Sequence, residues 1–295
     1  MKVQTKIILL LVAVTAIFAG GVWFLRLAER QNVRRIAEER FTERHRSFED
    51  FLEHHGEPLK TMVLDYTAWD QMVEATVKGD DAWFEENVGD AALDSFHTNA
   101  VWIYGKDGKR VHRTNNLGSD GLDEVPVPRE AIAQLFAQAP LAHFFAETPL
   151  GLMEICGGTI HPSKDFERTT PAEGFFFAGR LWSQPVLDEM SMFTGNKVSL
   201  APPTRSGENL NDEKDGVIAF SRPLHGWDGR PLADLVVRNE SPVVRELNRA
   251  SERLLFSVVL FSLALLLILA FALMRWVSRP LRRAMESLKR NDPKP

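Results

Sequence analysis

The hexamer D-Y-T-A-W-D at residues 65–70 places two carboxylates around two aromatic rings and is the sharpest local pattern in the chain. On a helix, Tyr66 and Trp69 lie on one apolar stripe with Asp70 at its margin, while Asp65 points about 90° away. A carboxylate beside buried rings needs a hydrogen-bond donor. That donor could be a loop N–H, an arginine or a ligand amine, and we expect Asp70 to tie a loop to the helix.

Arg180 is the residue best suited to bind a ligand. It lies in the aromatic stretch 174–182. A guanidinium there can bind a carboxylate through two parallel hydrogen bonds while the rings line an apolar pocket. The plainer alternative is an edge arginine paired with a carboxylate of its own domain. If the hairpin at residues 100–113 lies beside this stretch, its side chains can help to line the pocket. Alternate side chains of a strand point to opposite faces, so some of the candidates belong to the core instead. The candidates are Trp102, Tyr104, Arg113, Phe177 and Trp182.

Catalytic patterns are not found in the sequence. The eight histidines include neither an H-E-x-x-H motif nor a pair four residues apart, so we expect no metal site. There is no phosphate loop, dinucleotide glycine pattern or nucleophile elbow, and we expect no cofactor. Cys156, the single cysteine, lies in an apolar run and is expected to be a buried, unreactive thiol. These observations argue against an enzyme.

Two uncharged apolar segments, residues 7–25 and 254–274, frame the polar middle of the chain. Each approaches the roughly 20 residues that a helix needs to cross a bilayer. We predict a cytoplasmic N-terminus at residues 1–6, transmembrane helices at 7–25 and 254–276, and a module of residues 26–253 between them. A cleaved signal peptide is the alternative for the first segment, but that segment is long and ends in large side chains.

Charge sets the orientation of the chain. The two outer flanks hold nine of the 35 lysines and arginines and two of the 40 acidic residues, which leaves 26 basic against 38 acidic residues in the module. Cationic flanks stay in the cytoplasm. We therefore predict an inner-membrane protein with two spans, both termini cytoplasmic and the module periplasmic or extracellular. An acidic module also argues against a nucleic-acid partner.

The module begins with a predicted long helix, or two collinear helices, over residues 26–77. Pro58 should kink or restart it near Gly56, since proline removes a backbone donor and clashes with the preceding turn. The helix either packs on its own domain or, near the membrane, pairs with the same helix of a second subunit to form a homodimer. Its apolar stripe alternates spacings of four and three residues: Phe48, Leu52, His55, Leu59, Met62, Tyr66, Trp69 and Val73.

Beyond this helix the pattern changes to strands and short helices. Asp-Gly turns predict hairpins, and loops rich in proline and polar residues separate the elements. We predict an α+β fold with a mixed or antiparallel sheet and a long N-terminal helix. The expected elements are an amphipathic stretch at 80–88, a hairpin of 100–104 with 110–113, helices at 128–146 and 185–193, strands at 152–160, 174–182, 197–200 and 215–221, a hairpin at 222–230 leading into 232–237, and a helix from residue 242.

Four motifs resemble the CHASE domain of class 4: the hexamer, W-F-E-E-N-V at residues 83–88, the strand and turn at 99–108, and G-F-F-F-A-G-R at 174–180. The resemblance covers about residues 43–237. It implies an extracytoplasmic sensory domain of a prokaryotic signalling protein, held between two membrane spans and related in fold to PAS and Cache domains. It also implies that the motif residues are structural: Asp65, Tyr66, Trp69, Asp70, Asn87 and Asn99.

Residues 277–288 resemble the opening of a HAMP relay, in which a proline follows the membrane helix and an amphipathic helix begins. Pro280 is that proline, and Leu281, Met285 and Leu288 keep the spacing of four and three. A complete relay needs a second helix, so residues 277–295 are expected to be a truncated HAMP-like start. The chain would then be a truncated product, a fragment of a larger signalling protein, or a subunit that borrows the output of a histidine kinase or of a cyclic-di-GMP cyclase or phosphodiesterase.

The sequence therefore predicts a membrane-bound sensory receptor module. It would detect an extracytoplasmic signal, a small unidentified ligand, and transmit it through the second span to a HAMP-type relay and a cytoplasmic signalling partner. The alternative is a ligand-independent periplasmic binding or scaffold subunit that contacts a partner protein. The lipid bilayer and a second copy of the chain are the other expected partners.

Overall fold

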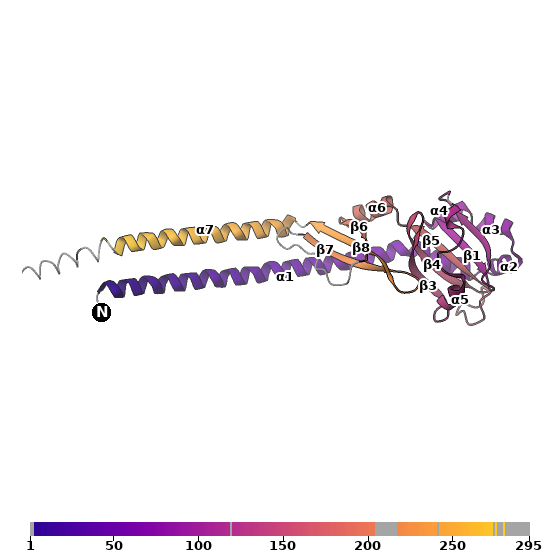
Figure 1. Ribbon diagram of the computed structural model, residues 1–295, viewed down its shortest axis with the longest axis horizontal. Coiled ribbons are helices and arrows are strands. Elements are labelled where there is room, and N and C mark those ends of the chain that lie inside the picture. The colour runs from indigo at the N-terminus through magenta and orange to yellow at the C-terminus, as the bar shows by residue number, and fades with distance from the viewer. Residues whose placement is uncertain are drawn as a thin grey trace, which may run out of the picture. The chain divides into compact units, whose positions relative to one another are not determined.

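The computed structural model describes residues 3–118, 120–203, 217–240, 242–273, 275 and 280. The chain divides into two compact units, whose elements are labelled in Figure 1. The globular unit comprises Thr42–Asn211 and Val217–Glu240. The helical unit comprises Met1–Phe41, Asp212–Gly216 and Ser241–Pro295.

The helical unit contains the first part of α1 (Val3–Thr67) and all of α7 (Pro242–Leu273). Within α7, Arg249–Ala272 is a stretch of 24 residues with a mean hydropathy of 3.0, and little of it is buried. By length and composition this stretch can cross a membrane. The described part of α1 contains a shorter apolar stretch, Val12–Ala28.

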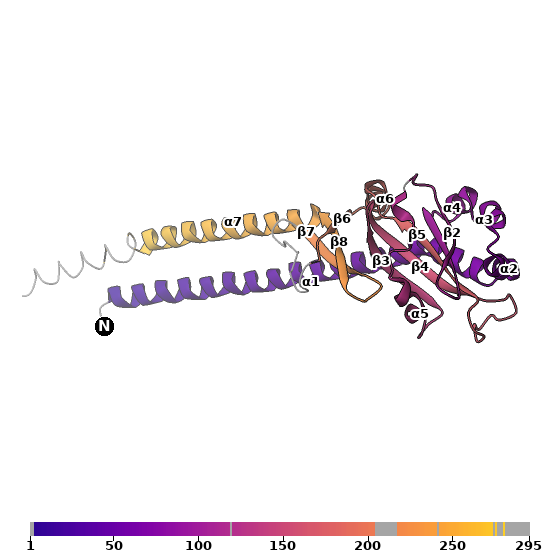
Figure 2. The same cartoon turned by 45° about the vertical axis from the view of Figure 1, so that its right-hand side comes forward.

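The globular unit is built on a five-stranded antiparallel sheet with the strand order β2-β1-β5-β4-β3 (Figures 1 and 2). The first predicted hairpin is confirmed, because β1 and β2 pair antiparallel. In the middle of the sheet, β5 places Phe177 opposite Trp102 of β1 and Arg180 opposite Glu154 of β4. The strands are β1 (Ala100–Gly105), β2 (Arg110–Asn115), β3 (Leu141–Thr148), β4 (Gly151–Ile160) and β5 (Gly174–Leu181).

This sheet is buried on both faces. Successive side chains of a strand point to opposite sides, so Phe176 and Phe177 of β5 enter two different cores, and both are fully buried. The core around Phe176 also holds Met62 of α1, and the core around Phe177 holds Ile132 of α5. The other helices of this part are α2 (Asp70–Lys78), α3 (Asp81–Asn87), α4 (Asp90–Ser95), η1 (Asp120–Leu122) and α5 (Arg129–Leu135).

A second antiparallel sheet has the order β6-β8-β7 and packs against α1. The ring centroid of Phe220 on β7 lies 5.7 Å from that of Phe48 on α1. A parallel bridge between Phe145 and Gly226 connects the two sheets, and the second predicted hairpin is confirmed as β7 and β8. The fold is therefore of the predicted α+β class. The elements are α6 (Gln184–Thr194), β6 (Lys197–Ala201), β7 (Val217–His225) and β8 (Pro231–Glu240).

The helix predicted over residues 128–146 is wrong in its second half. α5 ends at Leu135, and residues 141–148 form β3. Phe144 lies opposite Ile155 of β4, so the apolar side chains that suggested a helical face are spaced along a strand. A short apolar run fits both periods, and here pairing with β4 decides between them.

The sequence predicts a kink or a restart near Gly56, but the helix does not restart there. The helix predicted over residues 26–77 is instead interrupted between Thr67, where α1 ends, and Asp70, where α2 begins. α1 continues through Pro58 and ends at Thr67. The carbonyl oxygen of Thr67 accepts a hydrogen bond of 2.8 Å from the N–H of His161, and the Thr67 hydroxyl accepts one of 2.6 Å from Arg168. The helix thus ends where another segment supplies donors for its terminal groups.

Several predictions lie outside the described residues. These are most of the loop at 201–214, residues 274 and 276 of the second predicted span, and three relay residues, Leu281, Met285 and Leu288. Pro280 is described and is exposed.

Candidate functional site

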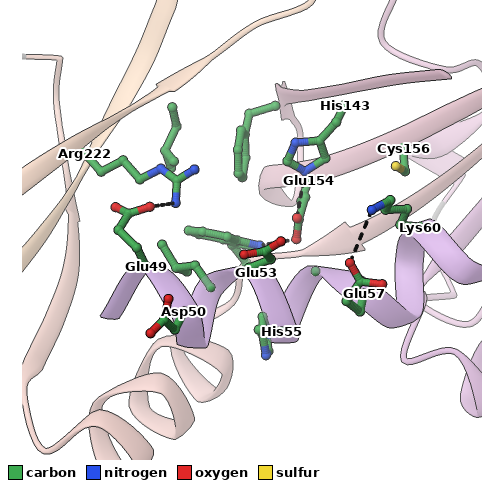
Figure 3. A pocket seen from close by; sticks show the side chains of 15 residues that line it. Glu49, Asp50, Glu53, His55, Glu57, Lys60, His143, Glu154, Cys156 and Arg222 are labelled. Atoms are coloured by element: carbon green, nitrogen blue, oxygen red, sulfur yellow. Dashed lines mark hydrogen bonds and ion pairs between the residues drawn. The ribbon is translucent and has the colours of Figure 1, made fainter. Parts of the chain in front are cut away.

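A groove of about 480 Å³ opens in the globular unit between α1, the β3–β4 side of the main sheet, and β7 (Figure 3). Its walls combine charged side chains from the helix with aromatic and polar side chains from the sheets. The principal lining residues are Glu49, Glu53, Gly56, Glu57 and Lys60 of α1, His143 and Phe145 of β3, Glu154 and Cys156 of β4, Trp182 after β5, and Arg222 and Leu224 of β7.

The helix repeat places the α1 residues of the groove on one face. Glu49, Glu53, Gly56 and Lys60 follow one another at spacings of four, three and four residues. At Gly56, a Cβ atom would lie 3.6 Å from Oε1 of Glu154. The backbone of α1 therefore passes close to the Glu154 carboxylate.

A buried ion pair next to the groove joins β4 to β5. Nη2 of Arg180 lies 2.6 Å from Oε2 of Glu154, and each side chain is only 5% exposed. Nε1 of Trp182 donates to the same oxygen at 3.0 Å, and Nε2 of His143 lies 2.9 Å from the other oxygen. Burial by itself raises the pKa of Glu154, but the hydrogen bond from His143 and the charge of Arg180 outweigh burial and lower the pKa to about 2. The carboxylate is therefore charged at physiological pH.

Arg180 also holds α1. Its Nη1 donates a hydrogen bond of 2.7 Å to the carbonyl oxygen of His55, one residue before Gly56. One guanidinium thus connects Glu154 of the sheet to the backbone of the helix. The Arg180 guanidinium thus binds a carboxylate of its own domain, and the binding of a ligand carboxylate by Arg180 stays a prediction. The plainer alternative holds, although the pair is buried rather than at an edge.

The other predicted pocket residues do not form one site with Arg180. Trp102, Tyr104 and Phe177 are fully buried in the core on the opposite face of the sheet. The cause is strand alternation: Phe177 and Arg180 are three residues apart on β5 and therefore point to opposite sides. Of the predicted set, Trp182 is the residue that lines the groove.

The polar atoms on that opposite face hold the segment around residues 122–125. Nε1 of Trp102 donates to the carbonyl oxygen of Leu122 at 2.8 Å, and the hydroxyl of Tyr104 donates to Glu124 at 2.8 Å. Arg113 pairs with Asp123 at 2.8 Å. These groups are satisfied within the protein, which makes the face a structural core.

The family-motif residues lie away from the groove and connect neighbouring elements. Asp70 accepts hydrogen bonds from the N–H and the hydroxyl of Ser163 at 2.9 and 2.6 Å, so its donor is a loop, and these bonds lower the pKa of Asp70. The hydroxyl of Tyr66 donates to the carbonyl oxygen of Asn87 at 2.9 Å. The remaining motif residues are Trp69, whose ring lies 5.0 Å from that of Trp83, Asn99, whose side-chain oxygen accepts from the N–H of Leu181 at 2.9 Å, and Asp65, which is exposed.

Sequence reasoning missed Glu154, although the sequence contains a signal for it. An acidic residue inside the apolar run L-M-E-I-C requires a buried cationic partner. That run draws attention to Cys156, which is buried, and whose thiol pKa is raised to about 12 by burial and then by the charge of Glu154. The groove residues Glu53 and Arg222 give no such signal, since charged residues on a helix or an edge strand are common.

A cluster of Asp81 and Glu85 of α3 with His112 of β2 has a geometry that could hold a metal ion, because its ligand atoms all lie within 4.8 Å of one another. Nδ1 of the buried His112 lies 2.7 Å from Oδ1 of Asp81, and its ring stacks on Phe84 at 5.0 Å. These contacts account for the position of the ring without an ion. The expectation of no metal site stays a prediction.

His55 should make the stability of the globular unit depend on pH. Its ring stacks on Phe51 at 5.6 Å. Burial, followed by the charge of Arg180, lowers the pKa of His55 from 6.5 to about 4. The unfolded chain therefore takes up this proton at a higher pH than the folded chain does. The free energy of unfolding falls as the pH drops from about 6.5 to about 4.

Between neutral and mildly acidic pH, we expect the free energy of unfolding of His55→Gln to fall by about 1 to 2 kcal/mol less than that of the wild type. This figure allows for the partial exposure of the ring. The measurement is urea unfolding of the full chain in detergent at neutral and at mildly acidic pH. His54→Gln, which changes the adjacent exposed histidine, should keep the wild-type difference. Equal differences in all three proteins would contradict the role of His55.

A family model for the CHASE4 domain matches residues 51–201, which include most of the groove but not Glu49, Asp50, Arg222 or Leu224. Two crystal structures of the periplasmic domain of LuxQ from Vibrio cholerae are similar to the chain. One has 10% identity and a TM-score of 0.44, and the match covers 68% of this chain and 99% of the LuxQ chain. The other has 12% identity and a TM-score of 0.46, and the match covers 68% of this chain and 97% of the LuxQ chain. No curated protein matches the chain.

Proposed function

The chain belongs to the CHASE4 family of extracytoplasmic sensor domains, and we propose that it is a membrane-bound receptor module that detects a small ligand in the groove beside α1. In this proposal two spans hold the sensor outside the cytoplasmic membrane. The signal leaves through α7 to a HAMP-type relay and a cytoplasmic partner. The membrane-length stretch of α7 and the cationic flanks support this arrangement. A homodimer formed by α1 near the membrane stays a prediction.

The position of the groove along the chain supports this proposal most strongly. α1 is one helix of 65 residues that carries both the apolar stretch Val12–Ala28 and the groove residues 49–60. On the other wall, β7 contributes Arg222, and β7 pairs with β8, which ends two residues before α7 begins. A ligand in the groove would therefore contact α1, which continues into the first predicted span, and β7, whose hairpin partner β8 leads into the second.

The bond between Arg180 and the His55 carbonyl suggests how occupancy of the groove would reach the membrane. Glu154 lines the groove and also orients Arg180, which holds α1. A ligand that binds better to one position of α1 than to another shifts the helix toward that position. A coupling free energy of about 1 to 3 kcal/mol is typical of such linked sites.

The test is a binding screen with the full chain in lipid nanodiscs. Amino acids, amines, carboxylates and sugars are scanned for compounds that raise the unfolding temperature, and each hit is mapped by hydrogen–deuterium exchange. We expect a hit that slows exchange at residues 49–60 and 141–156. A screen without hits, or hits that protect only other regions, would contradict ligand detection in the groove and favour the scaffold alternative.

A further inference from the structure

The groove carries more negative charge than its own cations neutralise. Five carboxylates line it, against two cationic side chains. Both cations are already paired on the walls: Arg222 with Glu49 at 2.7 Å and Lys60 with Glu57 at 3.3 Å. Glu154 is paired with the buried Arg180, which lies next to the groove. Among the described residues, the lining carboxylates without a counter-charge are therefore Glu53 and Asp50.

Glu53 is the carboxylate in the best position to meet a ligand. It lies on the groove face of α1, one turn after Glu49 and one turn before Glu57, as Figure 3 shows. Within the part of the chain that the structure describes, its carboxylate has no ion pair or hydrogen bond. Asp50 is likewise unpaired there, but it lies at the rim, where it also lines a neighbouring groove.

The side of the groove opposite α1 carries an apolar and aromatic patch beside the polar His143, Glu154 and Arg222. The rings of Phe145 and Trp182 meet edge to face with centroids 4.9 Å apart, and Leu224 extends this surface. All three side chains are largely buried, so they form a fixed surface. Aromatic faces beside carboxylates suit an organic cation, whose charge is attracted by both. A hydrated inorganic cation would gain little from such a wall.

We propose that the groove binds a small organic cation, a primary amine or amidine on an apolar body, with the charge at Glu53 and the body against Phe145 and Trp182. This inference rests on the proposed function and names the class of its ligand. The groove volume of about 480 Å³ falls within the range of about 300 to 1,000 Å³ that is usual for small-molecule sites. An anion of the same shape would face unpaired carboxylates and is excluded by charge.

The test uses three probes of similar shape and different charge: 2-phenylethylamine, 2-phenylethanol and 3-phenylpropanoate. Binding to the full chain in phosphatidylcholine nanodiscs is measured by calorimetry at neutral pH, and heats from empty nanodiscs are subtracted. We expect the amine to bind at least about tenfold more tightly than the alcohol or the carboxylate, as one charge-assisted hydrogen bond implies.

Glu53→Gln should weaken binding of the amine by at least about tenfold. Because Glu53 is exposed and unpaired, this variant should unfold at the wild-type temperature. Glu130→Gln removes an exposed carboxylate of α5, which does not line the groove, and should leave the affinity unchanged. It therefore controls for the loss of one negative charge.

Three outcomes would overturn the cation assignment: the amine does not bind, the carboxylate or alcohol binds as tightly as the amine, or Glu53→Gln leaves the affinity unchanged. The proposed function has a separate outcome. If an uncharged or anionic compound of the screen protects the groove, the proposed receptor function is supported and the assignment of an organic cation is contradicted. If no compound protects the groove, the proposed function and the cation assignment are both contradicted.

Discussion

Glu154→Gln is expected to lower the free energy of unfolding of the globular unit by about 3 to 5 kcal/mol, because it leaves the buried Arg180 guanidinium without a counter-charge. Both side chains of this pair are only 5% exposed, and three groups bind the carboxylate. The measurement is urea unfolding of the full chain in detergent, followed by tryptophan fluorescence.

The matched control is the ion pair of Glu49 with Arg222, which is almost the same length but about 40% exposed, at 36% and 43%. Glu49→Gln should cost no more than about 1 kcal/mol, because water screens an exposed pair. The double variant Glu154→Gln/Arg180→Met should regain part of the loss, since no uncompensated charge remains. Equal losses for Glu154→Gln and Glu49→Gln would contradict the role of the buried pair.

Trp102→Ala is expected to cost about 3 to 5 kcal/mol, the usual range for removing a large aromatic side chain from a core. Trp102 is fully buried, and its indole donates a hydrogen bond to Leu122. Because it lies on the face of the sheet opposite Arg180, the folded fraction of the variant should keep the wild-type affinity for a groove ligand.

Trp227→Ala provides the comparison for Trp102→Ala, because Trp227 is 36% exposed in the turn between β7 and β8. Its loss should change stability by no more than about 1 kcal/mol. Urea unfolding gives the stability of both variants, and calorimetry gives their affinity. A stable Trp102→Ala protein that no longer binds the ligand would contradict a purely structural role and indicate that Trp102 lines a binding pocket.

Much of the fold follows from local patterns in the sequence. The two Asp-Gly turns correctly predict the hairpins of β1 with β2 and of β7 with β8, because these turns need the positive φ that glycine tolerates. The helical stripe is read correctly from Phe48 to Tyr66, since helical periodicity persists over many turns, but Trp69 and Val73 lie beyond the end of α1. The helix predicted up to residue 146 is wrong because the short apolar run between Pro140 and Pro149 fits both the helical and the strand period.

The site could not be predicted to the same degree, because it depends on how strands pair. Nothing local shows that Glu154 lies opposite Arg180, or that α1 passes both at Gly56. Without that register, Arg180 looks free to bind a ligand and Trp102 looks like its neighbour. The sheet places them on two different faces, with Arg180 on the face that packs against α1.

In the proposed receptor, a ligand in the groove changes the relation between α1 and α7, the two helices that carry the predicted spans. In the helical unit, Asn32 of α1 and Leu254 of α7 line a common groove, so labels near them report on both helices. Spin labels can be attached at Gln31→Cys and Arg253→Cys, because the native Cys156 is buried and its thiol pKa is high.

The most direct test is the distance between these two labels, measured by pulsed electron spin resonance with the full chain in nanodiscs and an excess of unlabelled chain. A compound that protects residues 49–60 from exchange should shift the distance distribution. The shift should be lost in Arg180→Met, in which the helix is no longer bound at the His55 carbonyl. A compound that occupies the groove and leaves the distribution unchanged would contradict the claim.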